Sequence, residues 1–250
     1  MSLAVLPTAR DEEWRYADFA ALDTLAPEAF GVWKDVALAP GETRRKCLVL
    51  GGDAPELHRI RLDVAEGARA ELFVVNLGDG YTRVEAQVRL AKGAHFEFGG
   101  VTIGGGEATR EFVTRTVHAE PEATSNQVVR AVHWGSATGN FLGRIDVARA
   151  AQKTDAAQDF KGLLLERGAS ANAKPELEIF ADDVKCAHGA AIGELDETAR
   201  FYMAARGIPP EAVNRLLVRA FVADAFAAVE DAAEQETLLA AALAALGEAA

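Results

Sequence analysis

Two residues in the last third of the chain, Cys186 and His188, have side chains that could bind a metal. They are two residues apart, so on a strand both side chains would point to the same face. A thiolate and an imidazole suit iron, zinc or copper, and the neighbouring Lys185 is expected to lower the pKa of the thiol. The same pattern also fits a buried cysteine beside a hydrogen-bonded histidine. Two ligands cannot complete a tetrahedral site, so a metal here would need others from elsewhere in the fold or from another subunit.

Common catalytic signatures are missing from the rest of the chain. The sequence has no GxxxxGK[ST] loop, no HExxH and no GxSxG, which argues against a nucleotide-binding P-loop, a zinc protease and a serine hydrolase elbow. Residues 99–106 are rich in glycine, but no helix signal follows them, which favours a turn over a phosphate cradle. His58 and His95 fall in alternating segments, where ordinary packing is expected. No complete catalytic set is visible.

The composition narrows the possible classes of partner. The chain has 250 residues, half of them hydrophobic, and its formal charge is −12. A binder of nucleic acid needs a basic surface, so DNA or RNA is not expected as the main partner. We expect no signal peptide, because the first residues include no basic region. We expect no membrane span, because every long apolar stretch is interrupted by charged residues. The predicted location is the cytoplasm.

The middle of the chain, residues 31–194, has the alternating pattern of strands. Apolar and polar residues alternate over 58–64 and 82–90, and turns containing glycine separate such segments. The pattern of residues 62–68 recurs at 88–94, an offset of 26. Related patterns occur at two further places, residues 117–123 and 163–169.

A period of about 25 residues made of strand and turn fits one coil of a parallel β-helix. Because neighbouring strands lie about 4.8 Å apart, roughly six coils would form a rod of about 30 Å. An ordinary β-sandwich also repeats strands at short intervals, so periodicity alone leaves both open.

Helices are predicted at both ends of the chain. Residues 11–26 favour one short amphipathic helix within an N-terminal segment, residues 1–30. Residues 195–250 form a predicted helical domain. Its three helices are expected at 196–206, 211–226 and 234–246.

Longer stretches of sequence resemble one known family. Residues 173–197 are similar to the C-terminal signature of the SufB/SufD family of iron–sulfur cluster scaffold proteins. Their sequence is AKPELEIFADDVKCAHGAAIGELDE. Residues 201–217 continue this similarity, and residues 139–145, 152–157 and 13–16 add to it. RIDV at 144–147 and the Cys-Ala-His-Gly form resemble the SufD side of the family.

The resemblance implies a mainly β chain, with a right-handed parallel β-helix core and a small C-terminal helical domain. It implies a non-catalytic scaffold subunit that pairs with SufB and with SufC, an ABC-type ATPase, and that forms a homodimer when alone. A transient iron–sulfur cluster shared within the complex, and a reduced flavin there, are the cofactors it implies, with none bound tightly by the isolated chain. The chain resembles a short form that lacks most of the family's N-terminal helical region.

The resemblance also suggests roles for residues. It places His188 opposite a SufB cysteine at the subunit interface, as a transient ligand of the nascent cluster, with Cys186 second. The stretch Val184–Ala190 is the expected SufB-facing edge. The apolar stripe and basic residues of helix 211–226 are expected to dock SufC: Val213, Arg215, Leu216, Leu217, Arg219 and Phe221.

Two enzyme hypotheses compete with the scaffold. A β-helix lyase or hydrolase acting on carbohydrates would explain the repeats and the many acids. Such enzymes line a groove with aromatic residues, which make up 7% here, and no aspartate cluster recurs with the repeat. A metal-dependent small-molecule enzyme using Cys186 and His188 has too few visible ligands.

Overall fold

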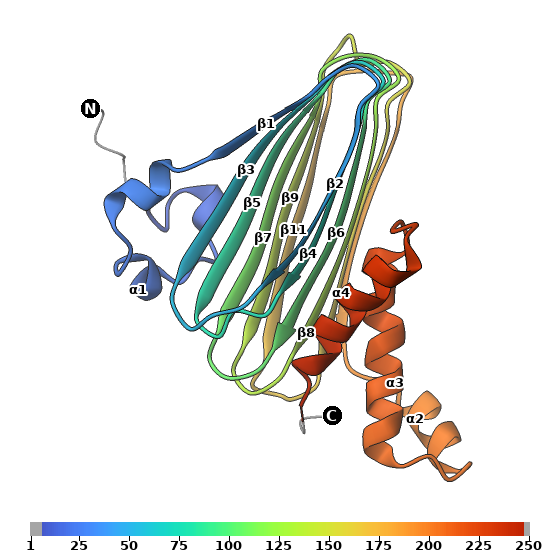
Figure 1. Ribbon diagram of the computed structural model, residues 1–250. Coiled ribbons are helices and arrows are strands. Elements are labelled where there is room, and N and C mark those ends of the chain that lie inside the picture. Colours follow the sequence, from blue (N-terminus) through green and yellow to red (C-terminus); the bar gives the residue numbers. More distant parts are fainter. Residues whose placement is uncertain (1–6, 248–250) are drawn as a thin grey trace.

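The computed structural model describes residues 7–247, which form two parallel sheets and several short helices (Figure 1). The strands are β1 (Lys34–Leu38), β2 (Thr43–Leu50), β3 (Glu56–Val64), β4 (Arg69–Asn76), β5 (Tyr81–Leu90), β6 (His95–Gly104), β7 (Thr109–His118), β8 (Thr124–His133), β9 (Thr138–Val147), β10 (Asp155–Leu164), β11 (Ser170–Ile179) and β12 (Lys185–Gly193). The α-helices are α1 (Phe19–Leu22), α2 (Glu197–Ala204), α3 (Pro210–Ala223) and α4 (Ala232–Ala244). The 3₁₀ helices are η1 (Glu12–Trp14), η2 (Pro27–Gly31) and η3 (Asp224–Phe226).

The strands alternate between two six-stranded sheets. Odd-numbered strands form one sheet in the order β1-β3-β5-β7-β9-β11, and even-numbered strands form the other, β2-β4-β6-β8-β10-β12. Every neighbouring pair is parallel, as between β3 and β5 or between β10 and β12. One odd and one even strand therefore make one coil, and six coils stack into a β-helix, which confirms the predicted fold class. A β-sandwich is excluded because its sheets are antiparallel.

The repeat read from the sequence is correct in part. Leu62 and Val88 are register partners on β3 and β5, so the offset of 26 is one coil. Later coils are longer, and Thr138 and Ser170 pair across 32 residues. The copy proposed at 163–169 is wrong, because it connects β10 to β11 at the opposite end of the coil from the turn after Leu62. Residues 62–68 and 163–169 have similar sequences because each segment leads from a strand into a tight turn, although the two turns lie at opposite ends of the coil.

The turns between odd and even strands stack on one another. Gly67 and Gly93 have φ values of 64° and 61°, and the Gly67 N–H donates to the Lys92 carbonyl of the next turn at 2.9 Å. The equivalent residues of later coils, Glu122 and Lys153, keep φ values of 66° and 65° although they are not glycine. Stacking therefore imposes a left-handed conformation that these side chains disfavour. The weak copy at 117–123 is confirmed as an equivalent turn.

Alternate residues of each strand point into the space between the two sheets, here called the lumen. Its middle coils are filled by aromatic and aliphatic side chains, of which the fully buried phenylalanines are Phe96, Phe98, Phe112, Phe141 and Phe160. The Phe141 and Phe160 rings stack with centroids 5.9 Å apart. Such packing fixes the register, because a one-residue slip would turn these rings outward.

The helices α3, η3 and α4 cover part of the outer face of the even sheet, whereas α2 lies beyond α3 (Figure 1). The predicted helices are confirmed within a few residues, with Asp196 and Asp231 capping α2 and α4. Gly99 lies on β6, not in the predicted turn, and a Cβ there would come within 2.0 Å of the Ala225 carbonyl, so this glycine lets η3 approach the sheet. Within residues 7–247 no helix is long and apolar enough to span a membrane.

The N-terminal segment covers part of the outer face of the odd sheet. The single helix predicted for 11–26 is wrong: only η1 and α1 form there, and Pro27 begins η2. Polar side chains of the sheet hold this segment by its backbone. Arg83 donates to the Glu13 carbonyl at 2.9 Å, and Asn140 donates to the Tyr16 carbonyl at 3.2 Å. These contacts replace the regular helix that the sequence pattern alone favoured.

Candidate functional site

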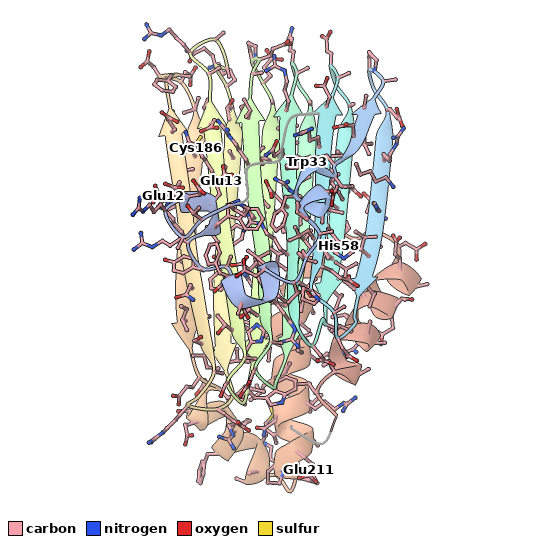
Figure 2. All side chains as sticks on the ribbon, turned by 90° about the vertical axis from the view of Figure 1, so that its left-hand side faces the viewer. Glu12, Glu13, Trp33, His58, Cys186 and Glu211 are labelled. Atoms are coloured by element: carbon pink, nitrogen blue, oxygen red, sulfur yellow. The ribbon has the colours of Figure 1, made fainter. Side chains whose placement is uncertain are left out.

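Cys186 and His188 lie on β12, the last strand of the even sheet. In register they pair with Ala156 and Gln158 of β10, both of which are buried in the lumen. Because register partners in parallel strands point to the same side, Cys186 and His188 share the inner face, as their spacing predicted. Figure 2 shows Cys186 on the last coils and His58 toward the other end of the rod.

The Cys186 thiol is half-buried and packs with the apolar end of the lumen. Its neighbours in this cluster include Val147 and Ala156. Burial raises the pKa of this thiol, and the negative charge of Asp155 raises it further. The expectation that Lys185 would lower the thiol pKa is therefore wrong, because burial dominates. A cysteine in this state is a packed thiol that ionises less readily than a free one.

His188 is exposed although it points along the inner face. In the described part of the chain β12 is the last strand of its sheet and pairs with β10 alone, so this end of the lumen is open beside His188. Within residues 7–247 no group of three or more His, Cys, Asp or Glu side chains is placed to hold a metal ion. The described part of the chain thus brings together two candidate ligands of the kinds that iron accepts.

The last coil also presents an uncovered edge of both sheets. In the described structure β12 pairs with β10 alone and β11 with β9 alone. Large apolar side chains of this coil are exposed: Ile179, Phe180 and Ile192. An edge of free backbone groups beside exposed apolar side chains suits pairing with another chain.

The residues predicted on helix 211–226 do not share one face of α3. Val213 is buried, and the buried face continues through Val218 and Val222, which the sequence analysis did not single out. Leu216 remains half exposed on another side. Val213 therefore packs within the chain and is not available to a partner.

The other predicted docking residues have different surroundings. Arg215 is exposed, whereas Arg219 forms an ion pair with Glu236 of α4 at 2.6 Å. Leu217 and Phe221 line a groove of about 340 Å³ between α3 and the last even strands. The structure thus divides the predicted set into exposed, paired and groove-lining residues.

Two exposed aromatic residues on α2 escaped the sequence analysis. Phe201 is 76% exposed and Tyr202 is 59% exposed, the highest values among large apolar side chains of α2 and α3. Arg206 stacks over the Tyr202 ring at 3.3 Å from its centroid. Adjacent aromatic residues on a short helix were the available signal, since only one of two neighbours can face the core.

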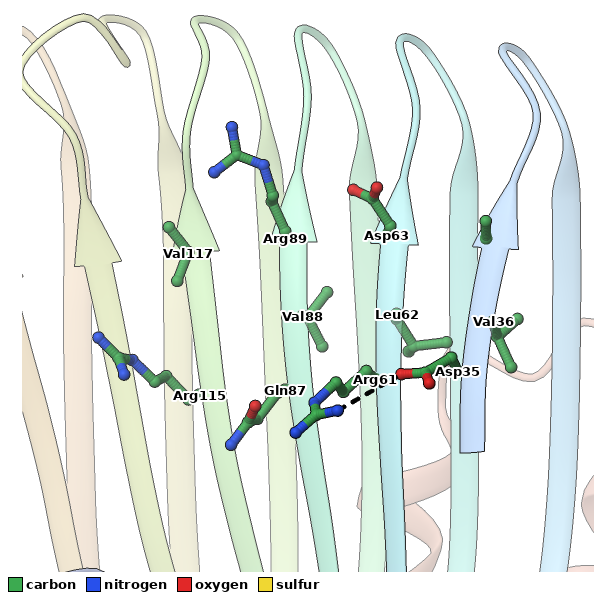
Figure 3. Close-up of a pocket in the computed structure, with 11 residues that line it drawn as sticks. Asp35, Val36, Arg61, Leu62, Asp63, Gln87, Val88, Arg89, Arg115 and Val117 are labelled. Atoms are coloured by element: carbon green, nitrogen blue, oxygen red, sulfur yellow. Dashed lines mark ion pairs between the residues drawn. The ribbon is translucent and has the colours of Figure 1, made fainter. Parts of the chain in front are cut away.

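A groove of about 650 Å³ lies on the outer face of the odd sheet (Figure 3). Two of its charged side chains are arginines in ion pairs: Arg61 pairs with Asp35 at 3.7 Å, and Arg115 pairs with Asp146, outside the groove, at 2.8 Å. The lining contains neither cysteine nor histidine. This surface therefore resembles a solvated ladder of ion pairs more than a site for soft metals.

Comparisons with known proteins relate most of this chain to one family. The family model "SUF system FeS cluster assembly, SufBD core domain" matches residues 47–221. Arabidopsis thaliana "Protein ABCI7, chloroplastic" is 41% identical over 116 residues, 46% of this chain and 24% of that protein. The Synechocystis SufBD family protein slr0076 is 32% identical over 174 residues, which cover 69% and 38% of the two chains.

Escherichia coli "Iron-sulfur cluster assembly protein SufD" is 35% identical over 123 residues, 49% of this chain and 29% of that protein. The matched part of this chain thus spans about a quarter to two fifths of the length of these relatives. The family match includes all strands from β3 to β12 and most of α3. The chain therefore belongs to the SufBD family of the SUF system, and it is of the SufD type.

Proposed function

We propose that this chain acts in iron–sulfur cluster assembly as a non-catalytic scaffold subunit that pairs with a SufB-type partner. The observation that carries the proposal is the placement of His188, exposed on the inner face of an open last coil, with the Cys186 thiol two residues away. Two candidate ligands on an uncovered edge suit a cluster completed by a second chain. The cluster is the cargo of this site.

The uncovered edge of the last coil supports pairing with a partner. Strand addition at β12 would satisfy its free backbone groups, and the exposed Phe180 and Ile192 side chains would be buried with it. The same edge could pair two copies of this chain when no SufB-type protein is present. Both assemblies would place the partner beside His188.

The helical unit is the proposed docking surface for the SufC-type ATPase. Its support is the exposed apolar surface on α2 and α3, which includes Phe201, Tyr202 and Leu216, with Arg215 exposed nearby in sequence. Aromatic and arginine side chains commonly anchor interfaces. A reduced flavin in the complex stays a prediction of the family resemblance.

The main test is the cluster content of the assembled complex. The chain is coexpressed with its SufB-type and SufC-type partners, purified anaerobically and assayed for iron and sulfide per complex. His188→Ala is expected to leave assembly intact and to reduce cluster yield at least tenfold. His58→Ala is the matched control, because His58 lies on β3, away from the last coil. Wild-type yield in His188→Ala would remove the ligand role.

Docking of the ATPase is tested separately. Arg215→Glu reverses an exposed charge and is expected to weaken binding of the SufC-type protein while the far-ultraviolet circular dichroism stays unchanged. Arg144→Glu, on the outer face of the odd sheet, is the control for charge reversal elsewhere. Equal binding by both variants and the wild type would refute docking at α3.

A further inference from the structure

Within residues 7–247 three arginines are almost completely buried, and two of them each pair with two carboxylates. Arg83 lies 3.3 Å from Glu111 and 3.5 Å from Glu85, both buried. Arg130 forms ion pairs with two aspartates on the outer face of the even sheet. A buried guanidinium needs such compensation, because its transfer out of water costs several kcal/mol in order of magnitude.

Arg110, the third, has one carboxylate partner within residues 7–247, and that partner is largely exposed. Its side chain points into the lumen on β7, on the same face as Phe112, and is fully buried. Within residues 7–247 its one ion pair joins Nη2 to Asp79 at 3.3 Å, and the Asp79 side chain is 73% exposed. The Nε and Nη1 groups donate to no described atom. Arg110 therefore keeps a buried positive charge with free donors.

Neighbouring residues leave room for the guanidinium but do not satisfy it. A Cβ at Gly104 would lie 2.3 Å from Nη2, so the glycine leaves this space to the guanidinium. His133 is buried at the same end of the lumen, where its Nδ1 faces the Gly104 carbonyl and its Nε2 faces the Thr102 hydroxyl, each at 3.0 Å. Because a carbonyl only accepts, Nδ1 carries the proton and Nε2 accepts from Thr102. The imidazole thus has no lone pair left for Arg110.

We propose that a small monovalent anion of halide size binds at the guanidinium of Arg110 inside this end of the lumen, accepting hydrogen bonds from its free donors. An anion supplies both the missing acceptors and the missing charge, whereas a water molecule supplies acceptors alone. Burial lowers the pKa of Arg110 to about 10. Burial also lowers the pKa of His133, and the positive charge of Arg110 adds to that shift. The Arg110 shift reflects the burial of its charge, which the negative charge of Asp79 offsets only in part.

Bromide is the probe, since it has halide size and scatters anomalously. In wild-type crystals soaked in sodium bromide, an anomalous peak is expected within about 3.5 Å of a guanidinium nitrogen of Arg110. In solution, bromide replaces gluconate at constant ionic strength while the thermal midpoint of the full chain is measured. A tenfold excess over the dissociation constant should raise the midpoint by about 3–6 °C.

Two variants test whether the effect of bromide on the thermal midpoint requires Arg110. Arg110→Met removes the charge and should abolish the bromide dependence. Arg144→Gln removes an exposed arginine on β9 and should keep it. A peak in crystals together with a bromide shift confined to chains with Arg110 supports the proposal.

The proposal fails if bromide does not change the thermal midpoint of the wild type, or if it changes that of Arg110→Met equally. It also fails if the anomalous map shows no bromide at Arg110. The crystal measurement needs the wild type alone, so it stays decisive if Arg110→Met does not fold. The outcome is independent of cluster assembly at His188.

Discussion

The middle coils and the last coil of the β-helix use the same strand pattern with opposite results. In the middle coils the inward side chains, such as Phe112 and Phe141, are fully buried between neighbours on both sides. In the last coil the inward His188 and its neighbour Ala190 are exposed, because only one side has a neighbouring coil. Position in the stack decides whether an inward residue stabilises the core or remains free to meet a partner.

The largest expected difference is in stability. Phe141→Ala removes a ring that stacks on Phe160 in the core, and should lower the free energy of unfolding by about 3–5 kcal/mol. Ile192→Ala in the last coil removes a side chain that is 47% exposed and should cost less than about 1.5 kcal/mol. Urea unfolding of both variants measures the difference. Equal losses would contradict the view that the last coil lies outside the core.

The pH dependence of the free energy of unfolding should also differ between substitutions in the middle coils and in the last coil. Burial lowers the pKa of His118 to about 4 and that of His133 to about 3, from an ordinary value of 6.5. Between pH 6.5 and 4 the unfolded chain binds protons that the native chain excludes. Stability therefore falls as the pH falls through this window, by up to about 1.4 kcal/mol per pH unit for each histidine.

Substitutions at these histidines identify the source of the slope. His118→Asn should reduce the slope of unfolding free energy against pH between 6.5 and 4. His188→Ala should leave it unchanged, because that side chain is exposed. A slope that survives in His118→Asn but is lost in His188→Ala would reverse the assignment.

Two glycines in one register row allow a matched comparison of packing. Gly99 faces η3, and an added Cβ would lie 2.0 Å from the Ala225 carbonyl. Gly189 lies in the same row on β12, and its added Cβ would meet only the flexible Asp159 carboxylate at 3.1 Å. Gly99→Ala should destabilise the chain by about 1–3 kcal/mol, and Gly189→Ala should be nearly neutral. Thermal unfolding of the two variants tests this.

The smallest stability effect is expected at the candidate site itself. Cys186→Ser and His188→Ala should each change the free energy of unfolding of the isolated chain by less than about 1 kcal/mol, with the half-buried thiol the larger of the two. A loss of several kcal/mol at His188 would mean that it holds the last coil together, so a drop in cluster yield could then reflect unfolding.

The local sequence pattern predicted some features of the structure correctly and others wrongly. Alternation and the offset between Leu62 and Val88 predicted repeated strands, and the two residues are register partners on neighbouring coils. The resemblance to the SufB/SufD family, and not this periodicity, selected a β-helix over a β-sandwich. The spacing of Cys186 and His188 predicted a shared face, since strand geometry fixes it. The helix expected at 11–26 failed, because contacts with Arg83 and Asn140 on distant strands outweighed its weak helical propensity.

The sequence by itself determined the repeated strands and turns, the helical C-terminal unit and the placement of a thiol and an imidazole on one face. These follow from residue periodicity, which is a local property. Only the tertiary structure decided that the Cys186 pKa rises, that Val213 is buried, and that no buried carboxylate of residues 7–247 pairs with Arg110. Burial and charge compensation depend on which distant strands meet, and no local spacing contains that information.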